Sequence, residues 1–136
     1  MHHYFIATES FDHIVDCFCP DSRHEDTLEI NEDSLIEVTE DRKFIMDRWY
    51  ILVVLNTSWQ FYMALEDVEN YFKEGKMMTS MDLELKLNYV SYKIDEALAK
   101  EDEASFIHHS KAQKKLCHLK EKLHVYLDRA SENHLM

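Results

Sequence analysis

Glycine and proline are almost missing from this sequence of 136 residues, which contains one of each, Gly75 and Pro20. Phosphate-binding loops, dinucleotide-binding fingerprints and the nucleophile elbow of serine hydrolases each need several glycines, because their backbone turns sharply or approaches a ligand closely. The scarcity of glycine therefore excludes the commonest nucleotide-dependent enzymes.

Long apolar runs are also missing, since no run approaches the 18 residues that a membrane-spanning helix needs. The first dozen residues carry two acids, Glu9 and Asp12, and no basic stretch, so we expect no signal peptide there. The three cysteines are an odd number without the spacing of a secreted disulfide framework, which indicates a reducing compartment. We therefore expect a cytoplasmic protein.

Basic residues are scarce in the first part of the chain. Residues 1–41 contain twelve acids and one base, Arg23, a formal charge of −11 against −12 for the whole chain. A solvated surface that keeps the protein in solution is the favoured interpretation. The alternative is a patch that meets a basic partner or mimics the backbone of a nucleic acid.

Apolar residues make up 46% of the chain, which is ample for a core. Their pattern predicts an α+β fold, in which a small antiparallel β-meander with one short helix is followed by a C-terminal two-helix hairpin. We place the strand-rich acidic module at residues 1–78 and the helical hairpin at residues 79–136. Strands are expected at residues 4–6, 28–30, 35–39, 43–46, 49–55 and 59–64, with turns at 40–41 and 56–58.

Two helices are expected in the N-terminal module. The spacing of Phe11, Ile14, Val15 and Phe18 is helical. A second short helix over residues 65–73 would turn three apolar side chains to the sheet and end at Gly75. These three are Val68, Tyr71 and Phe72.

The C-terminal hairpin is predicted from two apolar stripes. The first helix carries Leu83, Leu87, Val90, Ile94 and Leu98 on one face, and the second carries Ala112, Leu116, Leu119, Leu123 and Tyr126 or Leu127. A capping box at Thr79 and Asp82 would begin the first helix, and the turn at residues 100–102 would offer Asp102 as the next N-cap. A second apolar face of the first helix, formed by Leu85, Tyr89 and Tyr92, must be covered either by the N-terminal module or by another protein.

The first turning point of the hairpin reads Ile94-Asp95-Glu96-Ala97-Leu98. With the acidic turn and the aromatic Phe106 that follow, residues 92–116 resemble the small bacterial domain named IDEAL after these letters. The stretches at residues 47–50 and 65–69 are also similar to the N-terminal halves of small IDEAL-domain proteins of Gram-positive bacteria. The resemblance implies a cytoplasmic protein, or a diverged or phage-encoded relative of that family, with no catalytic residues to carry over.

The sequence offers two candidate chemical sites. His13, Cys17, Cys19 and His24 are residue types that bind zinc, but C-x-C spacing is unlike that of zinc sites, so buried cysteines and surface histidines are favoured. Asp21, Asp41 and Lys43 superficially suit a magnesium-dependent nuclease, but we expect Asp41 in a hairpin turn. We therefore expect no catalytic residues, no metal and no cofactor.

Two further groups could bind a partner. Trp49, Tyr50, Trp59 and Tyr62 would form either an aromatic platform or, as favoured, cross-strand core pairs. Lys111, Lys114, Lys115, His118 and Lys122 would form a basic helix face that either grips an anion or is simply solvated.

The sequence thus favours a non-enzymatic adaptor or regulator that binds another protein. The predicted binding residues are the second apolar face and the acids of the turn, namely Leu85, Tyr89, Tyr92, Asp95, Glu96, Glu101 and Asp102. The alternatives are a homo-oligomer formed through the hairpin and an acidic nucleic-acid mimic, such as a phage-encoded inhibitor of a host nucleic-acid-binding or defence protein.

Overall fold

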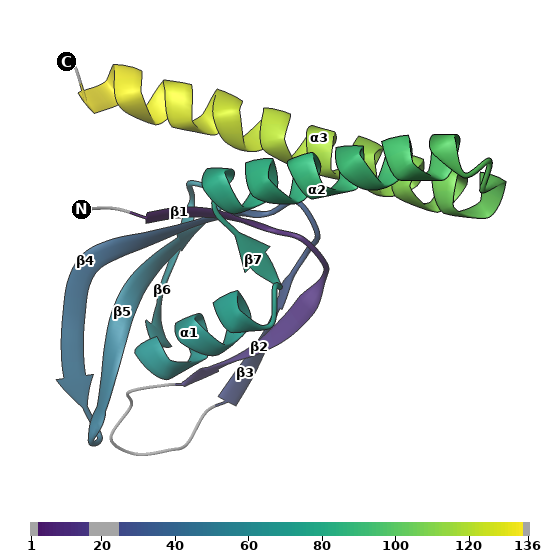
Figure 1. Ribbon diagram of the computed structural model, residues 1–136. Coiled ribbons are helices and arrows are strands. Elements are labelled where there is room, and N and C mark those ends of the chain that lie inside the picture. Colours follow the sequence, from purple (N-terminus) through teal and green to yellow (C-terminus); the bar gives the residue numbers. More distant parts are fainter. Residues whose placement is uncertain (1–2, 17–24, 135–136) are drawn as a thin grey trace. The chain divides into compact units, whose positions relative to one another are not determined.

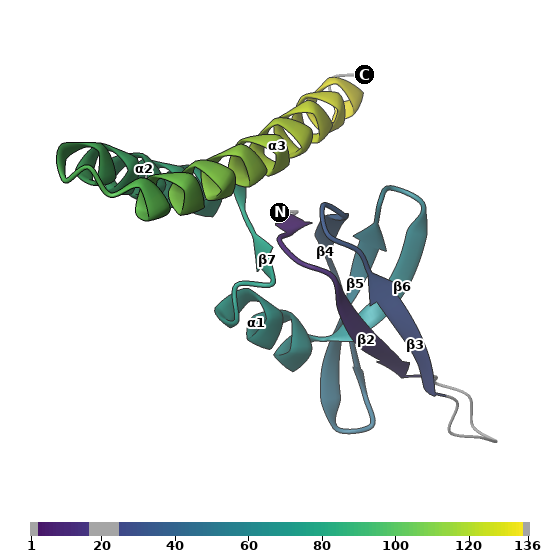
Figure 2. The same cartoon turned by 90° about the vertical axis from the view of Figure 1, so that its right-hand side faces the viewer.

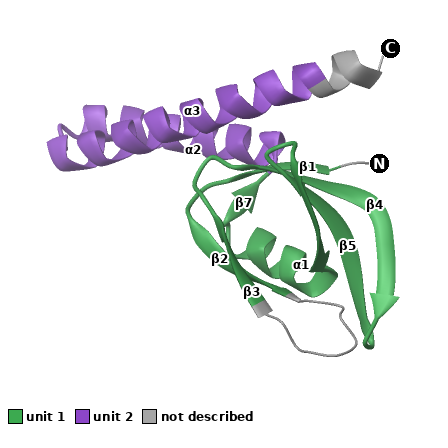
Figure 3. Cartoon of the chain, turned by 180° about the vertical axis from the view of Figure 1, so that it is seen from behind, with its two compact units in different colours: residues 1–78 green, residues 79–136 purple. Residues whose placement is uncertain are grey.

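The computed structural model describes residues 3–16 and 25–134 (Figure 1). Contacts divide the chain into two compact units, residues 1–78 (unit 1) and residues 79–136 (unit 2), which Figure 3 colours green and purple. Unit 1 contains strands and one short helix, and unit 2 contains two long helices. The predicted α+β fold is confirmed.

The main sheet of unit 1 has five antiparallel strands in the order β6-β5-β4-β1-β7. Their bounds are His3–Ala7 for β1, Leu35–Ile45 for β4, Arg48–Leu55 for β5, Trp59–Ala64 for β6 and Met77–Met78 for β7. A separate two-stranded ribbon pairs β2 (Phe11–Asp16) with β3 (Glu25–Ile30). Helix α1 (Leu65–Lys73) leads from β6 to β7 and lies beside this ribbon (Figures 1 and 2).

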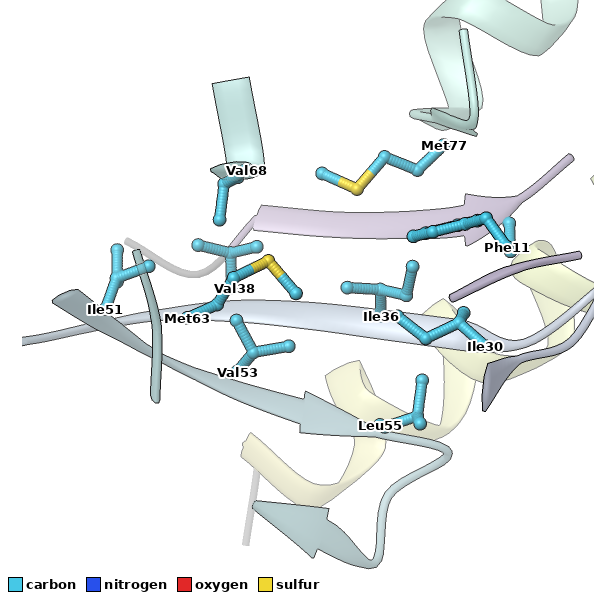
Figure 4. Close-up of a cluster of buried hydrophobic side chains, with 11 residues drawn as sticks. Phe11, Ile30, Ile36, Val38, Ile51, Val53, Leu55, Met63, Val68 and Met77 are labelled. Carbon is cyan, nitrogen blue, oxygen red and sulfur yellow. The ribbon is translucent and has the colours of Figure 1, made fainter. Parts of the chain in front are cut away.

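The core of unit 1 lies where one face of the main sheet meets α1 and the ribbon. Alternate residues of β4 and β5 face this core because successive side chains of a strand point to opposite sides. In Figure 4, side chains of β4 and β5 meet those of α1 and β7. The buried cluster consists of Ala7, Phe11, Ile30, Ile36, Val38, Ile51, Val53, Leu55, Met63, Val68 and Met77.

A hydrogen-bonded polar pair, His13 and Tyr71, lies at the edge of this core. His13 is only 2% exposed, and its Nδ1 lies 2.8 Å from the hydroxyl of Tyr71 on α1. The His13 ring also packs against Phe61 of β6, with ring centroids 5.9 Å apart, and the Tyr71 ring packs against Phe11 at 4.7 Å. The pair therefore fastens the ribbon to both α1 and the main sheet.

The helix expected from the spacing of Phe11, Ile14, Val15 and Phe18 is wrong for residues 11–16, which form strand β2. Phe11 and His13 are buried and Val15 is half-buried, whereas Asp12 and Ile14 are exposed. This is the period of two typical of a strand. Ile14 is apolar but 55% exposed, and it supplied the misleading helical spacing. Phe18 lies outside the described residues.

The turn expected at residues 40–41 is also wrong. Residues 35–45 form one long strand, and the turn to β5 comes at Met46 and Asp47. The strand is irregular where the turn was expected, because the register shifts between Val38 and Arg42. The Thr39 hydroxyl stabilises this irregularity by donating to the Leu52 carbonyl at 3.0 Å and accepting from the Asp41 N–H at 3.2 Å. A β-bulge thus replaces the predicted turn.

The secondary structure predicted for the rest of unit 1 is confirmed, but one side chain of the predicted helix is placed differently. The strands over residues 49–55 and 59–64, the turn at Asn56–Ser58 and the helix over residues 65–73 are present, and Gly75 ends that helix with φ of +74°. The N–H groups of Gly75 and Lys76 return to the carbonyls of Phe72 and Tyr71, which is a Schellman motif. Phe72 was expected to face the sheet but is 44% exposed, and its ring meets that of Phe5 edge to face with the centroids 5.8 Å apart.

Unit 2 is an antiparallel pair of helices, α2 (Ser80–Ala99) and α3 (Glu103–His134). The capping box predicted at Thr79 and Asp82 is present, and so is the seam of α3 at Leu116, Leu119 and Leu123. Polar contacts between the two helices include Ser80 with His124 at 3.5 Å, Gln113 with Ser91 at 3.4 Å and Lys120 with Glu84 at 3.7 Å. Across residues 3–16 and 25–134, no helix is both long and apolar enough to cross a membrane.

The apolar stripe by which α2 packs on α3 differs from the prediction at the C-terminal end of α2. Leu98 was expected in the seam but is 58% exposed, and Ala97 is buried in its place. The physical reason is the tight turn, in which the Asp102 N–H returns to the Ala97 carbonyl at 2.9 Å. A small side chain fits where the two helices converge on this turn.

The partly buried Tyr71 side chain is expected to make the stability of unit 1 fall at alkaline pH. Burial, followed by the charges of Asp67 and Glu74, raises the pKa of Tyr71 to about 12. An unfolded tyrosine ionises near pH 10, so between about pH 10 and 12 the unfolded chain releases a proton that the folded chain retains. We therefore expect unit 1 to keep this contribution below pH 10 and to lose it progressively toward pH 12.

Urea unfolding at pH 8, 10 and 11.5, followed by the fluorescence of Trp49 and Trp59, tests this expectation because both tryptophans lie in unit 1. The Tyr71→Phe variant should lose less stability with rising pH than the wild type. Part of the decline should remain, since burial and Glu37 also raise the pKa of Tyr4. Identical pH profiles for the two proteins would contradict the role of Tyr71.

Candidate partner-binding surface

Three large side chains stand exposed along one stripe of α2. Leu85, Tyr89 and Tyr92, called the outer face below, are 62%, 57% and 62% exposed. Spacings of four and three residues put them on the same side of the helix. Single exposed apolar residues are normal on a protein surface, but a contiguous group is typical of an interaction site.

Charged residues flank the outer face on both sides. Lys93 lies on one edge, with its Nζ 5.7 Å from the centre of the Tyr89 ring, and Asp95 is exposed on the other edge. Met81, which is 71% exposed, extends the apolar stripe by one turn toward the start of α2. An apolar centre with a charged rim is the usual anatomy of a protein–protein interface.

Two of the predicted acids stabilise the hairpin itself. Glu96 lies 3.3 Å from Lys100 and 3.8 Å from Lys93, and these lysines lower its pKa, Lys100 most strongly through its hydrogen bond. Asp102 caps α3 by accepting hydrogen bonds from the Ser105 N–H at 3.2 Å and the Ser105 hydroxyl at 2.8 Å, which lower the pKa of Asp102. Both carboxylates therefore have a structural role that does not require a partner.

Glu101 occupies the left-handed position of the turn, with φ of 55°. Its N–H returns to the Leu98 carbonyl at 3.2 Å, so it stands at the place that glycine usually holds in a Schellman motif. Glu101 and Asp102 lie beyond the end of α2, past Asp95 and Glu96. The seven predicted residues thus comprise an apolar face with Asp95 and Glu96 beside it, and a separate polar turn.

The other candidate sites are not assembled in the part of the chain that the structure describes. Cys17, Cys19, His24 and Asp21 lie outside that part, and His13 is buried against Tyr71. Asp41 lies within β4, where it accepts a hydrogen bond from the Tyr62 hydroxyl at 2.9 Å. Within residues 3–16 and 25–134, no group of three His, Cys, Asp or Glu side chains is placed to hold a metal ion.

The aromatic platform on the sheet does not form. Trp49 stands opposite Phe44 near one end of β5, whereas Trp59 stands opposite Leu55 at the other end. Tyr50 is 3% exposed and belongs to the interior, while Lys43 lies 4.4 Å over the Tyr62 ring. The favoured alternative, cross-strand core pairs, is also wrong for the two tryptophans, since they are 53% and 64% exposed.

The basic face of α3 is present but is not a defined site. Lys111, Lys114, Lys115 and His118 are exposed and Lys122 is half-buried. A different exposed surface, at the tip of the β4–β5 hairpin, was not predicted from the sequence. The turn was expected at residues 40–41, which placed Met46 in a strand instead of at the tip.

Comparisons with known proteins give no identity for the chain: no model of a protein family matches it, and neither a curated protein nor a solved structure does.

The exposure of the outer face predicts that it can be altered without unfolding the protein. Tyr89→Asp should leave the free energy of unfolding of unit 2 within about 1 kcal/mol of the wild type, because the side chain is exposed. The neighbouring Val90→Asp should cost about 3 kcal/mol or more, because Val90 is 3% exposed and a buried carboxylate lacks a partner. Thermal melts followed by circular dichroism at 222 nm would distinguish the two variants. Equal damage from both would show that Tyr89 is part of the core.

Glu101 has a left-handed backbone conformation, and replacing it tests whether this conformation carries strain. Glu101→Gly should stabilise unit 2 by about 1 kcal/mol, because glycine adopts positive φ without the penalty of a Cβ atom. Glu103→Gly, one residue into α3, should destabilise it instead. The melting temperatures of the two variants check this, and a lower value for Glu101→Gly would contradict the assigned backbone strain.

Proposed function

We propose that this chain is a non-enzymatic adaptor or regulatory protein that binds another protein through unit 2. The observation that carries the proposal is the outer face of α2, where Leu85, Tyr89 and Tyr92 remain more than half exposed. Burying two tyrosines and a leucine would supply the aromatic and apolar anchor that dominates many interfaces. The resemblance of residues 92–116 to the IDEAL domain, and a cytoplasmic location, are part of this proposal.

The rim of the outer face supports a partner with both apolar and charged groups. Lys86 and Lys93 follow one edge of the stripe and Asp95 lies on the other. Such exposed charges add specificity and increase the rate of association more than the affinity. Glu96 and Asp102 already bind Lys100 and Ser105, so we assign the direct charged contacts to Asp95 and Glu101.

A second candidate is an acidic mimic that occupies a nucleic-acid-binding protein. One observation favours it, namely the pairing of Asp12 with Glu29 in the β2–β3 ribbon, where both side chains are exposed. Like charges directly opposite each other destabilise a ribbon. A basic partner would relieve that repulsion, and the same charges would attract it at a distance.

A paired capture experiment tests the proposal. Wild type, Tyr89→Asp and Leu98→Asp would each be used to capture proteins from lysate of the source cell, with identification by mass spectrometry. Leu98→Asp is the matched control, because Leu98 is 58% exposed on the opposite side of α2. We expect one protein to be enriched by wild type and Leu98→Asp and reduced at least tenfold with Tyr89→Asp.

The outcomes separate the two candidates. A partner retained by Tyr89→Asp but released by salt or by Asp12→Asn with Glu29→Gln would favour the acidic mimic over the adaptor. A partner lost equally with Leu98→Asp would show that binding depends on the fold of the helix and not on the outer face. A second copy of the chain as the captured protein would identify a homo-oligomer.

A further inference from the structure

Unit 1 carries a second exposed apolar surface, independent of unit 2, at the tip of the β4–β5 hairpin. Phe44, Met46 and Trp49, called the tip patch below, are 58%, 65% and 53% exposed. Phe44 and Trp49 are direct cross-strand partners with ring centroids 5.2 Å apart. The patch therefore has a fixed aromatic pair beside a flexible methionine, a combination that suits the binding of a peptide.

The turn that carries Met46 is unusual for a residue of this type. Met46 and Asp47 have φ of 53° and 63°, both in the left-handed region. Two-residue hairpin turns with positive φ at both positions usually contain asparagine, aspartate or glycine. Methionine bears a steric penalty there, so its presence at an exposed tip is not explained by the needs of the fold, and strain of this kind is frequent at ligand-binding positions.

An open pocket of about 280 Å³ adjoins the tip patch, with Trp49 common to both. Its lining residues are Asp47, Arg48, Trp49, Leu65, Glu66 and Glu69, from the hairpin and from α1. The volume is just below that of common small-molecule pockets, which begin near 300 Å³. The pocket therefore suits a single long side chain of a peptide.

The charges of the pocket select the sign of that side chain. Three carboxylates face one guanidinium, and Arg48 already pairs with Glu66 at 3.6 Å. Asp47 and Glu69 line the same pocket and add two further negative charges to it. A cation beside these carboxylates would also lie near the ring of Trp49, whose face attracts positive charge. The strong negative charge of residues 1–41 would draw a basic ligand toward unit 1.

We propose that the tip patch and its pocket bind a basic peptide segment of a partner protein. One lysine or arginine side chain lies in the pocket between Trp49 and the carboxylates of Asp47 and Glu69. An apolar residue next to it in the peptide packs on Phe44 and Met46. This site lies wholly within residues 44–69 and does not depend on the outer face of α2.

A labelled peptide tests the proposal with the full-length chain. The probe is a fluorescein-labelled, blocked heptapeptide Gly-Leu-Arg-Lys-Leu-Gly-Gly, and its control replaces arginine and lysine with glutamine. Fluorescence anisotropy should show binding of the basic probe, with a dissociation constant on the order of 0.1 mM at low salt, and at least tenfold weaker binding of the control. In a Trp59→Phe background, Trp49 is the sole tryptophan, and the basic probe should change its emission.

Matched variants locate the site. Trp49→Ala should weaken binding about tenfold. Trp59→Ala is the control, because Trp59 is also exposed and lies on the neighbouring strand β6, and this variant should change binding less than about twofold. Glu69→Gln should weaken binding roughly threefold to fivefold, whereas Glu29→Gln, an exposed acid on β3, removes the same charge and should have a smaller effect. Circular dichroism would confirm that each variant is folded.

Three results would overturn the proposal. Equal binding of the basic and glutamine probes would remove the selection for a cation. Equal weakening by Glu69→Gln and Glu29→Gln would show diffuse attraction to an acidic surface. Anisotropy without any change in Trp49 emission in the Trp59→Phe background would place the peptide elsewhere. None of these results bears on capture through Tyr89, so failure here is distinct from failure of the proposed function.

Discussion

Burial of one face of the five-stranded sheet is the constraint on which unit 1 depends. A sheet that is apolar on one face must cover it, and this chain does so with one short helix and a two-stranded ribbon. The His13–Tyr71 contact at 2.8 Å joins these two covers, and the rings of Phe11 and Phe61 pack around it. The tip of the β4–β5 hairpin contributes no residue to this core cluster, so its side chains can remain exposed.

Because the chain contains a single glycine, other residue types occupy most of its left-handed backbone positions. Six non-glycine residues in the described part adopt positive φ, and they are Asp33, Met46, Asp47, Asn56, Thr57 and Glu101. Asn and Asp tolerate this conformation better than most other residues. The Asn56 side chain is also held by a tertiary contact, because it accepts a hydrogen bond from the Leu35 N–H at 2.8 Å. Met46, Thr57 and Glu101 have no such intrinsic advantage. Two of these three, Met46 and Glu101, lie at the surfaces for which we propose binding.

Charge and apolar exposure are distributed differently in the two units. Unit 1 has an acidic surface with a small apolar tip, which suits a basic peptide. Unit 2 has an apolar stripe between a lysine edge and an aspartate edge, which suits a folded protein surface. An adaptor needs two separate binding surfaces, and the two units offer surfaces of different chemistry.

The sequence by itself determined the elements whose signals are local. The capping box at Thr79, the glycine stop at Gly75 and the apolar strand over residues 49–55 each depend on residues close in the chain, and all three are present. Local signals also predicted the α+β class and the exposed pair Tyr89 and Tyr92 as one face of a helix. They failed at Phe11–Val15 and at residues 40–41, where apolar spacing and acidic residues imitated a helix and a turn.

Only the tertiary structure decided which apolar residues are covered. Ile14, Trp49, Trp59 and Leu98 are as apolar as their buried neighbours, yet within the described residues they are more than half exposed. The burial of His13 depends on Tyr71, 58 residues further along the chain. The pocket beside Trp49 likewise needs α1 to approach the hairpin. Such contacts join residues that are distant in sequence, and periodicity along one segment carries no information about them.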